Sequence, residues 1–140
     1  MTHHNERGSA TLELVIVMPA TLLVLLGIIM AGRLALAQQA VQSVAHDAAR
    51  AASIERSSST AQQSANKVAN FSLASNGLSC ASTNVSVTTE GFTTTVGNNA
   101  TVQAQVTCVV TLADLTAPGI PGSVTITREA VSPIDRYKER

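Results

Sequence analysis

Aromatic side chains are nearly missing from this chain of 140 residues, which has two Phe, one Tyr and no Trp. Large rings supply much of the area that a small domain buries, so a core built without them is thin. Charge of either sign is also sparse: nine basic and nine acidic residues leave a formal net charge of zero, with no basic cluster. This balance argues against a nucleic-acid or polyanion partner. We expect a marginal domain that needs a crosslink, an anchor or an assembly.

The residue combinations of a catalytic or metal site are missing as well. His46 and Asp47 are neighbours on a predicted helix, so their side chains point in different directions. The serines and threonines have neither a glycine elbow nor a nearby base, and no segment resembles a phosphate cradle. His3, His4 and His46 are not spaced for zinc. We therefore predict a protein that is not an enzyme, with no catalytic residue, metal, cofactor or small-molecule substrate.

The chain has only two cysteines, Cys80 and Cys108. If their part of the chain lies outside the cytoplasm, a disulfide is the natural interpretation. This disulfide would close a loop of about 29 residues and stabilise the domain by roughly 3–4 kcal/mol in the chain-entropy model. Two buried free thiols are the alternative.

Charged residues are absent from residues 14–32, a run of 19 mostly apolar positions. As a helix this run covers about 28 Å, enough to cross the hydrocarbon core of a bilayer. Pro19 lies near its start, where it would bend a membrane helix or remove one hydrogen bond. Helical periodicity continues beyond Arg33 and predicts one helix from about Ser9 to Arg56, roughly 70 Å long. Its outer half presents a stripe of small residues suited to close packing: Val41, Val44, Ala45, Ala48 and Ala52.

The second half of the chain changes from a helical to a strand period. Ser59 and Gln62 form the pattern of a capping box, and they begin a second helix that is predicted to end at Asn76 and Gly77. Beyond it apolar and polar residues alternate, most cleanly over 101–112. We predict an α+β fold in which the long membrane-spanning helix continues into an outer domain. That domain adds a second short helix and a three- to four-stranded antiparallel sheet, whose dry face the helix stripe covers.

The N-terminal residues allow three interpretations. In the first, the apolar run is an uncleaved single-pass anchor for a surface-binding module, and Glu13 is an ordinary residue at its flank. In the second, the chain is secreted after cleavage between Ala37 and Gln38, although Arg33 intrudes and the run is long for a signal peptide. The third starts from Gly8, because counting from the residue after it places Glu13 fifth, at the mouth of the apolar run.

This third interpretation is a resemblance to a known family. The stretch "RG-SATLELVIVMPATLL" resembles the class III signal of type IV pilin-like proteins, and it is most similar to the TadE-like family, the minor pilins (pseudopilins) of tight-adherence (Tad) pili. The similar elements cover residues 7–52, about a third of the chain. Leu14, where the family often has an aromatic, and a single Arg in the alanine run depart from its pattern. The elements are Arg7-Gly8, Glu13, Pro19, Leu22-Leu23, Gly27, Gly32-Arg33 and Ala48-Ala49-Arg50-Ala51-Ala52.

The resemblance implies a processed pilin-like subunit. A prepilin peptidase would cut after Gly8, which divides the chain into a leader (1–8), a long helix (9–56) and an extracytoplasmic domain (57–140). The implied location is the cytoplasmic membrane or an extracellular pilus, and the implied role is pilus assembly or initiation and hence adhesion. Its implied partners are the prepilin peptidase, the major and minor pilins, and a platform membrane protein with its cytoplasmic ATPase.

Cleavage after Gly8 would also give Glu13 a partner. It creates an α-amine on Ser9 that is largely protonated near neutral pH. A carboxylate inside a bilayer costs about 2.5–3.5 kcal/mol at mid-membrane and less near the edge, and a cation offsets that cost. Glu13 lies about 6 Å along the helix from its own Ser9. In assembled pili of the superfamily the amine of a neighbouring subunit is the implied partner, so Glu13 would select the correct docking register.

Overall fold

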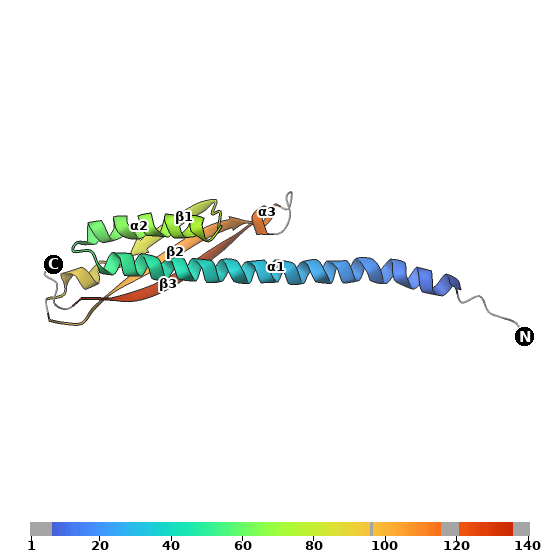
Figure 1. Ribbon diagram of the computed structural model, residues 1–140, viewed down its shortest axis with the longest axis horizontal. Helices are drawn as coiled ribbons and strands as arrows, with labels where there is room; N and C mark the ends of the chain where they lie inside the picture. The colour runs from blue at the N-terminus through green and yellow to red at the C-terminus, as the bar shows by residue number, and fades with distance from the viewer. Residues whose placement is uncertain (1–6, 96, 116–120, 136–140) are drawn as a thin grey trace, which may run out of the picture.

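The longest element is helix α1 (Arg7–Ser53), 47 residues in one unbroken run (Figure 1). It confirms the predicted single helix, although it ends at Ser53 instead of Arg56. This computed structural model describes three stretches of the chain, with side chains from Glu13 onward: residues 7–95, 97–115 and 121–135.

Pro19 lies inside α1 without ending it. A proline has no N–H to donate within a helix, and neighbouring hydroxyl groups commonly satisfy the carbonyls around it in membrane helices. Here the single proton of the Thr21 hydroxyl is shared between the carbonyls of Val17 (3.1 Å) and Met18 (2.9 Å). These are ordinary back-bonds of a helical threonine, whereas the carbonyl that loses its donor to Pro19 is that of Val15; the helix continues through the proline all the same.

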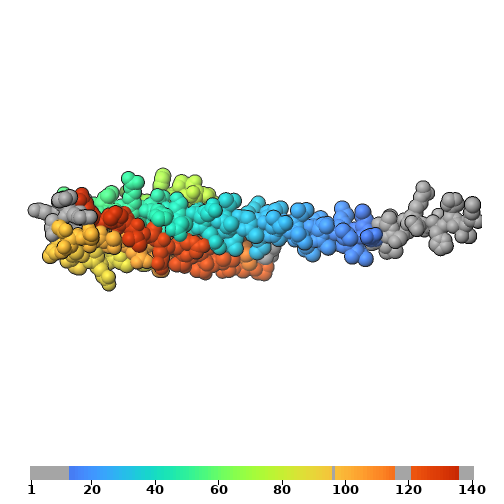
Figure 2. Space-filling view, turned by 90° about the horizontal axis from the view of Figure 1, so that it is seen from below, coloured from blue at the N-terminus to red at the C-terminus, as the bar shows by residue number. Residues whose placement is uncertain are grey.

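Side-chain burial divides α1 into two parts. Every side chain from Glu13 to Arg33 is exposed, and this part projects alone from the rest of the molecule (Figures 1 and 2). The later part carries a buried stripe at helical spacing, which confirms the predicted one and extends it with Ala37 and Ala49. The buried residues are Ala37, Val41, Val44, Ala45, Ala48, Ala49 and Ala52.

Helix α2 (Ser58–Ser75) begins two residues before the position that the sequence predicts. Its N-cap is Ser57, whose backbone is extended and whose Oγ accepts a hydrogen bond from the N–H of Thr60 at 3.3 Å. The capping box at Ser59 and Gln62 is therefore wrong, because the serine run offers an earlier cap and Gln62 bonds elsewhere.

The predicted end of α2 at Asn76 and Gly77 is correct. Gly77 has a positive φ of 67°, which favours glycine. Its N–H donates to Ala74 O, and the N–H of Leu78 donates to Leu73 O, both at 3.0 Å. This pair of bonds is a Schellman ending, and it satisfies carbonyls that the last turn leaves without helical partners.

Three strands form one antiparallel sheet in the order β1 (Ser82–Val87), β2 (Ala100–Thr111), β3 (Ser123–Ile134). The predicted alternation along β2 is confirmed: its even-numbered residues are buried, and Cys108 among them is fully inaccessible. A short 3-10 helix, η1 (Glu90–Thr93), precedes β2, and a four-residue helix, α3 (Leu112–Leu115), follows it. The result is the expected α+β, pilin-like arrangement.

The helices cover one face of the sheet as a single layer. α1 lies over β2 and β3, and α2 lies beside α1 and over β1 (Figure 1). The opposite face presents mainly short polar side chains. On it Glu129 of β3 accepts hydrogen bonds from the amides of Gln103 (2.6 Å) and Gln105 (2.7 Å), and the hydroxyls of Thr107 and Thr127 meet at 3.1 Å. The packed domain therefore has one dry layer, between the helices and the sheet.

Candidate functional site

The exposed part of α1 is the feature that carries the predicted function. Among the described residues, α1 is the one helix long and apolar enough to cross a membrane, and none of its most apolar stretch is buried. In water this surface would be strongly unfavourable, because aliphatic side chains lie on all sides of the helix. The arrangement supports a span at about 14–32, with the packed domain on one side of the bilayer.

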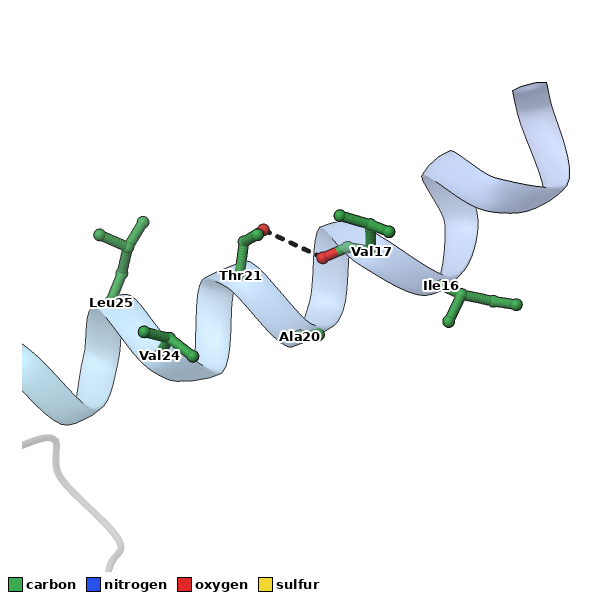
Figure 3. A pocket seen from close by; sticks show the side chains of 6 residues that line it. All are labelled: Ile16, Val17, Ala20, Thr21, Val24 and Leu25. Atoms are coloured by element: carbon green, nitrogen blue, oxygen red, sulfur yellow. Dashed lines mark hydrogen bonds between the residues drawn. The ribbon is translucent and has the colours of Figure 1, made fainter.

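A shallow apolar groove lies along this exposed part of α1. It has a volume of about 520 Å³ and is lined by Ile16, Val17, Ala20, Thr21, Val24 and Leu25 (Figure 3). Thr21 carries the one polar side-chain group of this lining, and its hydroxyl is bonded to helix carbonyls. The groove can accommodate hydrocarbon, either a lipid chain or another helix, and it has no group to orient a polar ligand.

The predicted processing and pairing residues lie at the start of the same helix. The backbone at Gly8 and Ser9 is helical, and their side chains lie outside the described part. Glu13 is exposed and lies directly before Leu14, the first residue of the uncharged run. The structure thus places Glu13 where the apolar run begins, and the pairing of Glu13 with a Ser9 amine stays a prediction.

Cys80 and Cys108 form the predicted disulfide, with their Cα atoms 5.5 Å apart. Cys108 lies in the second half of β2 and is buried, whereas Cys80 is half-buried in the segment between α2 and β1. The bond therefore attaches the chain leaving α2 to the central strand. The alternative of two free thiols is wrong.

Sequence reasoning missed the junction between the span and the packed domain. Arg33 is the first charged residue after the apolar run, and its Nη1 donates to Leu115 O of α3 at 3.3 Å. On β3, Arg128 Nη2 donates to Gln38 Oε1 at 3.0 Å across a small cavity of about 270 Å³. Because Arg33 directly follows an uncharged run, the sequence could have indicated that it lies at the boundary between that run and the packed domain. Its partner was not predictable, because Leu115 is 82 positions away in the chain.

Sequence reasoning also missed the role of Gln62. Its Nε2 donates to Val85 O at 2.7 Å, and its Oε1 accepts the N–H of Val87 at 3.0 Å. β1 is an edge strand, and an edge strand exposes unpaired backbone groups. One amide side chain of α2 thus occupies two of these groups and attaches the helix to the sheet.

Within the described stretches, no group of three or more His, Cys, Asp or Glu residues is placed to hold a metal ion. His46 is exposed, and its Nε2 lies 3.2 Å from the amide nitrogen of Gln42.

Comparison with known protein families gives a match for the N-terminal part of the chain. Residues 8–50 match a family model described as TadE-like protein. No curated protein and no solved structure matches the chain. The matched segment starts at Gly8 and covers the span and most of the buried stripe of α1. The chain therefore carries a TadE-like domain, which comprises residues 8–50.

Proposed function

We propose that this chain is a minor pilin (pseudopilin) of a Tad-type pilus. A TadE-like domain implies a protein related to this pilus system. In this proposal a prepilin peptidase first removes residues 1–8. The long helix, residues 9–56, then holds the subunit in the cytoplasmic membrane, and residues 57–140 face outward. The subunit then acts in pilus assembly or initiation, and hence in adhesion, as a structural component without enzymatic activity.

One observation carries this proposal: a single helix combines an unburied apolar part with a part packed under a small disulfide-bonded domain. A subunit of this shape can move from the bilayer into an assembly by exchanging lipid for neighbouring helices. The disulfide fits an extracytoplasmic location for the domain, since such bonds persist in oxidising compartments. The partners we propose are the prepilin peptidase, a platform membrane protein with its ATPase, the major pilin and other minor pilins.

The structure bears on the two alternative interpretations of the N-terminus. Cleavage after Ala37 would remove a residue that is buried in the core, and it would also remove Arg33, which bonds to α3. This argues against a secreted form that begins at Gln38. An uncleaved anchor is compatible with the same fold. Of the eight leader residues only Arg7 and Gly8 belong to α1, so the rest of the helix is the same with or without the leader.

The N-terminus of the protein extracted from membranes distinguishes these forms. We expect N-terminal sequencing or intact-mass measurement to give Ser9 as the first residue. A Gly8→Leu variant keeps an apolar residue at that position and should accumulate with Met1 at its start. If the wild type itself starts at Met1, the chain is an uncleaved anchor and the pilin proposal fails.

The proposed role of Glu13 needs a separate experiment. Glu13→Gln removes the charge with little change of size, so we expect the variant to insert into the membrane and lose incorporation into pili. Glu13→Asp keeps the charge and should retain part of the incorporation, which serves as the control. Formation of the Cys80–Cys108 disulfide should be normal in both variants. Wild-type assembly in the Glu13→Gln variant would rule out the charge-pairing role.

A further inference from the structure

The base of the packed domain, where α1 leaves the apolar run, has an unusual surface. We call this surface the collar and define it by three large side chains around the base of the domain and by a small cavity between α1 and Arg128. The large side chains are Arg33 and Leu36 of α1 and Arg128 of β3; the cavity is lined by Ala35, Gln38, Gln39, Gln42 and Arg128. We propose that the collar binds the phospholipid headgroups of the leaflet from which the domain projects. The inference rests on the proposed membrane span.

The position of the collar follows from the continuity of α1. Leu36 is four residues beyond Gly32, the last residue of the apolar run, and this corresponds to about 6 Å along a helix. The polar layer of each leaflet is about 5–8 Å thick. α1 has no break between the run and the collar, and the Arg33 bond to Leu115 holds α3 beside this point. Leu36 is therefore at the depth of the headgroups, and Gln38, the partner of Arg128, is about 9 Å beyond Gly32, at the outer edge of that layer. No linker lifts the domain away.

The apolar part of the collar is Leu36, whose side chain is 66% exposed. Beyond the apolar run, the other large hydrophobic residues that the structure records as exposed are Ile54, Phe71 and Val131. Leu36 is the one of these four that lies within two turns of the span. At the boundary between headgroups and acyl chains a leucine loses its contact with water, so its exposure is explained by insertion there.

The charged part of the collar is suited to phosphate. The recorded hydrogen bonds of Arg33 and Arg128 go to uncharged oxygens: Leu115 O, Thr127 O and Gln38 Oε1. Guanidinium groups bind phosphate with several parallel hydrogen bonds. The nearby carboxylates bond to other groups, Asp114 to Thr111 and Glu129 to two glutamines on the far face of the sheet. The cavity beside Arg128, about 270 Å³ in volume and bordered by glutamine amides, offers space for a headgroup.

The chain contains no Trp, so single-Trp variants report on one position each. The full chain is reconstituted into vesicles of phosphatidylcholine and phosphatidylglycerol, with Leu36→Trp as the test variant. Leu23→Trp reports on the span. Phe71→Trp is a matched aromatic replacement on the packed domain, where Phe71 is 74% exposed. Quenching is measured with lipids brominated close to the headgroup, with lipids brominated deep in the chain, and with aqueous acrylamide.

We expect three different depth profiles. Deep bromines should quench the Leu23→Trp variant, shallow bromines the Leu36→Trp variant, and acrylamide the Phe71→Trp variant. If the Leu36→Trp variant behaves like the Phe71→Trp variant while the Leu23→Trp variant is quenched by lipid, the collar is wrong and the span stands. If lipid fails to quench the Leu23→Trp variant, the span itself is wrong, and the proposed function fails with the collar.

A second substitution tests the guanidinium. Adding Arg128→Gln to the Leu36→Trp variant should weaken shallow quenching, because the base of the domain loses a phosphate contact that holds it against the leaflet. Arg56→Gln is the matched control, since Arg56 is exposed and lies beyond the end of α1, away from the span. Unchanged quenching in the Arg128→Gln variant would contradict the role of the cavity in headgroup binding.

Discussion

Between Leu14 and Met30, α1 exposes thirteen large aliphatic side chains, and between Ala37 and Ala52 it buries seven alanines and valines. Both parts belong to one helix and both are apolar, yet they require different surroundings. The first has aliphatic groups on every side, which suits a medium that is apolar all round. The second has polar residues such as Gln39, Ser43 and Arg50 on the side away from its stripe, which suits a boundary between core and water.

The size of the side chains explains how the second part packs. Alanines allow the axis of α1 to approach the sheet closely, and the valines and isoleucines of the strands then fill the space. A leucine-rich helix would stand further from the sheet and leave gaps. The comparison indicates that hydrophobicity alone does not separate a span from a core helix, whereas the size of the side chains and the presence of a polar face do.

The largest effects are expected when one charge is placed in each part of α1. Val24 is 63% exposed in the apolar run, and Val44 is 0% exposed in the core. Val44→Lys buries an unpaired ammonium, and we expect the packed domain not to fold, since the cost exceeds about 4–5 kcal/mol. Val24→Lys should leave the domain folded and weaken membrane insertion by about 2.5–3.5 kcal/mol.

Two measurements on the full chain read these effects separately. Hydrogen exchange of the β2 amides reports folding of the domain, and the carbonate-resistant membrane fraction reports insertion. Each variant should change one readout and spare the other. If both variants lose the same property, the two parts of α1 do not have separate environments.

The sequence predicted the elements whose signals are local. An uncharged run of sufficient length predicted the exposed part of α1, helical spacing predicted the stripe, and a period of two predicted the buried face of β2. The disulfide was predictable because the chain has only one possible pair. For the candidate site, the family match supports the region of Gly8 and Glu13, while the roles of these residues stay predictions.

The features that sequence reasoning missed depend on tertiary contacts. Gln62 has the spacing of a capping residue, but β1 is brought beside it by a fold that no local pattern records. The bonds from Arg33 to Leu115 and from Arg128 to Gln38 join positions far apart in the chain. Polar side chains of this kind have several possible partners, and the packing of the apolar faces decides among them.

The Cys80–Cys108 disulfide should stabilise the packed domain and have no effect on the apolar run of α1. We expect reduction of the wild-type chain to lower the free energy of unfolding of the packed domain by about 3–4 kcal/mol, because the bond closes a long loop in the unfolded state. Membrane insertion should not change, since both cysteines lie outside the span. The oxidised and the reduced chain are denatured in mild detergent, and hydrogen exchange of the β2 amides monitors the unfolding. The two curves give the difference in free energy of unfolding. Equal stability of the two forms would contradict this account.

A smaller effect is expected where α2 meets the sheet. Gln62→Ala removes two hydrogen bonds and leaves Val85 O and the N–H of Val87 at an uncovered edge, so we expect a loss of about 1–3 kcal/mol. Gln63→Ala is the matched control because Gln63 is an exposed neighbour, and it should change stability by less than about 0.5 kcal/mol. The Gln62 variant should also exchange the Val87 amide faster. A similar loss in both variants would assign the effect to helix propensity instead of the edge contact.

The smallest expected loss of stability comes from the N-cap of α2, and it distinguishes the observed cap, Ser57, from the predicted one, Ser59. Ser57 Oγ accepts the N–H of Thr60, so Ser57→Ala should lower the stability of the packed domain by about 1 kcal/mol. Ser59 lies inside the first turn and contacts Ser57 through its hydroxyl at 3.2 Å, so Ser59→Ala should cost less. Urea denaturation of the two variants under identical conditions gives the order. A larger loss for Ser59→Ala would restore the capping box and move the start of the helix back to the predicted position.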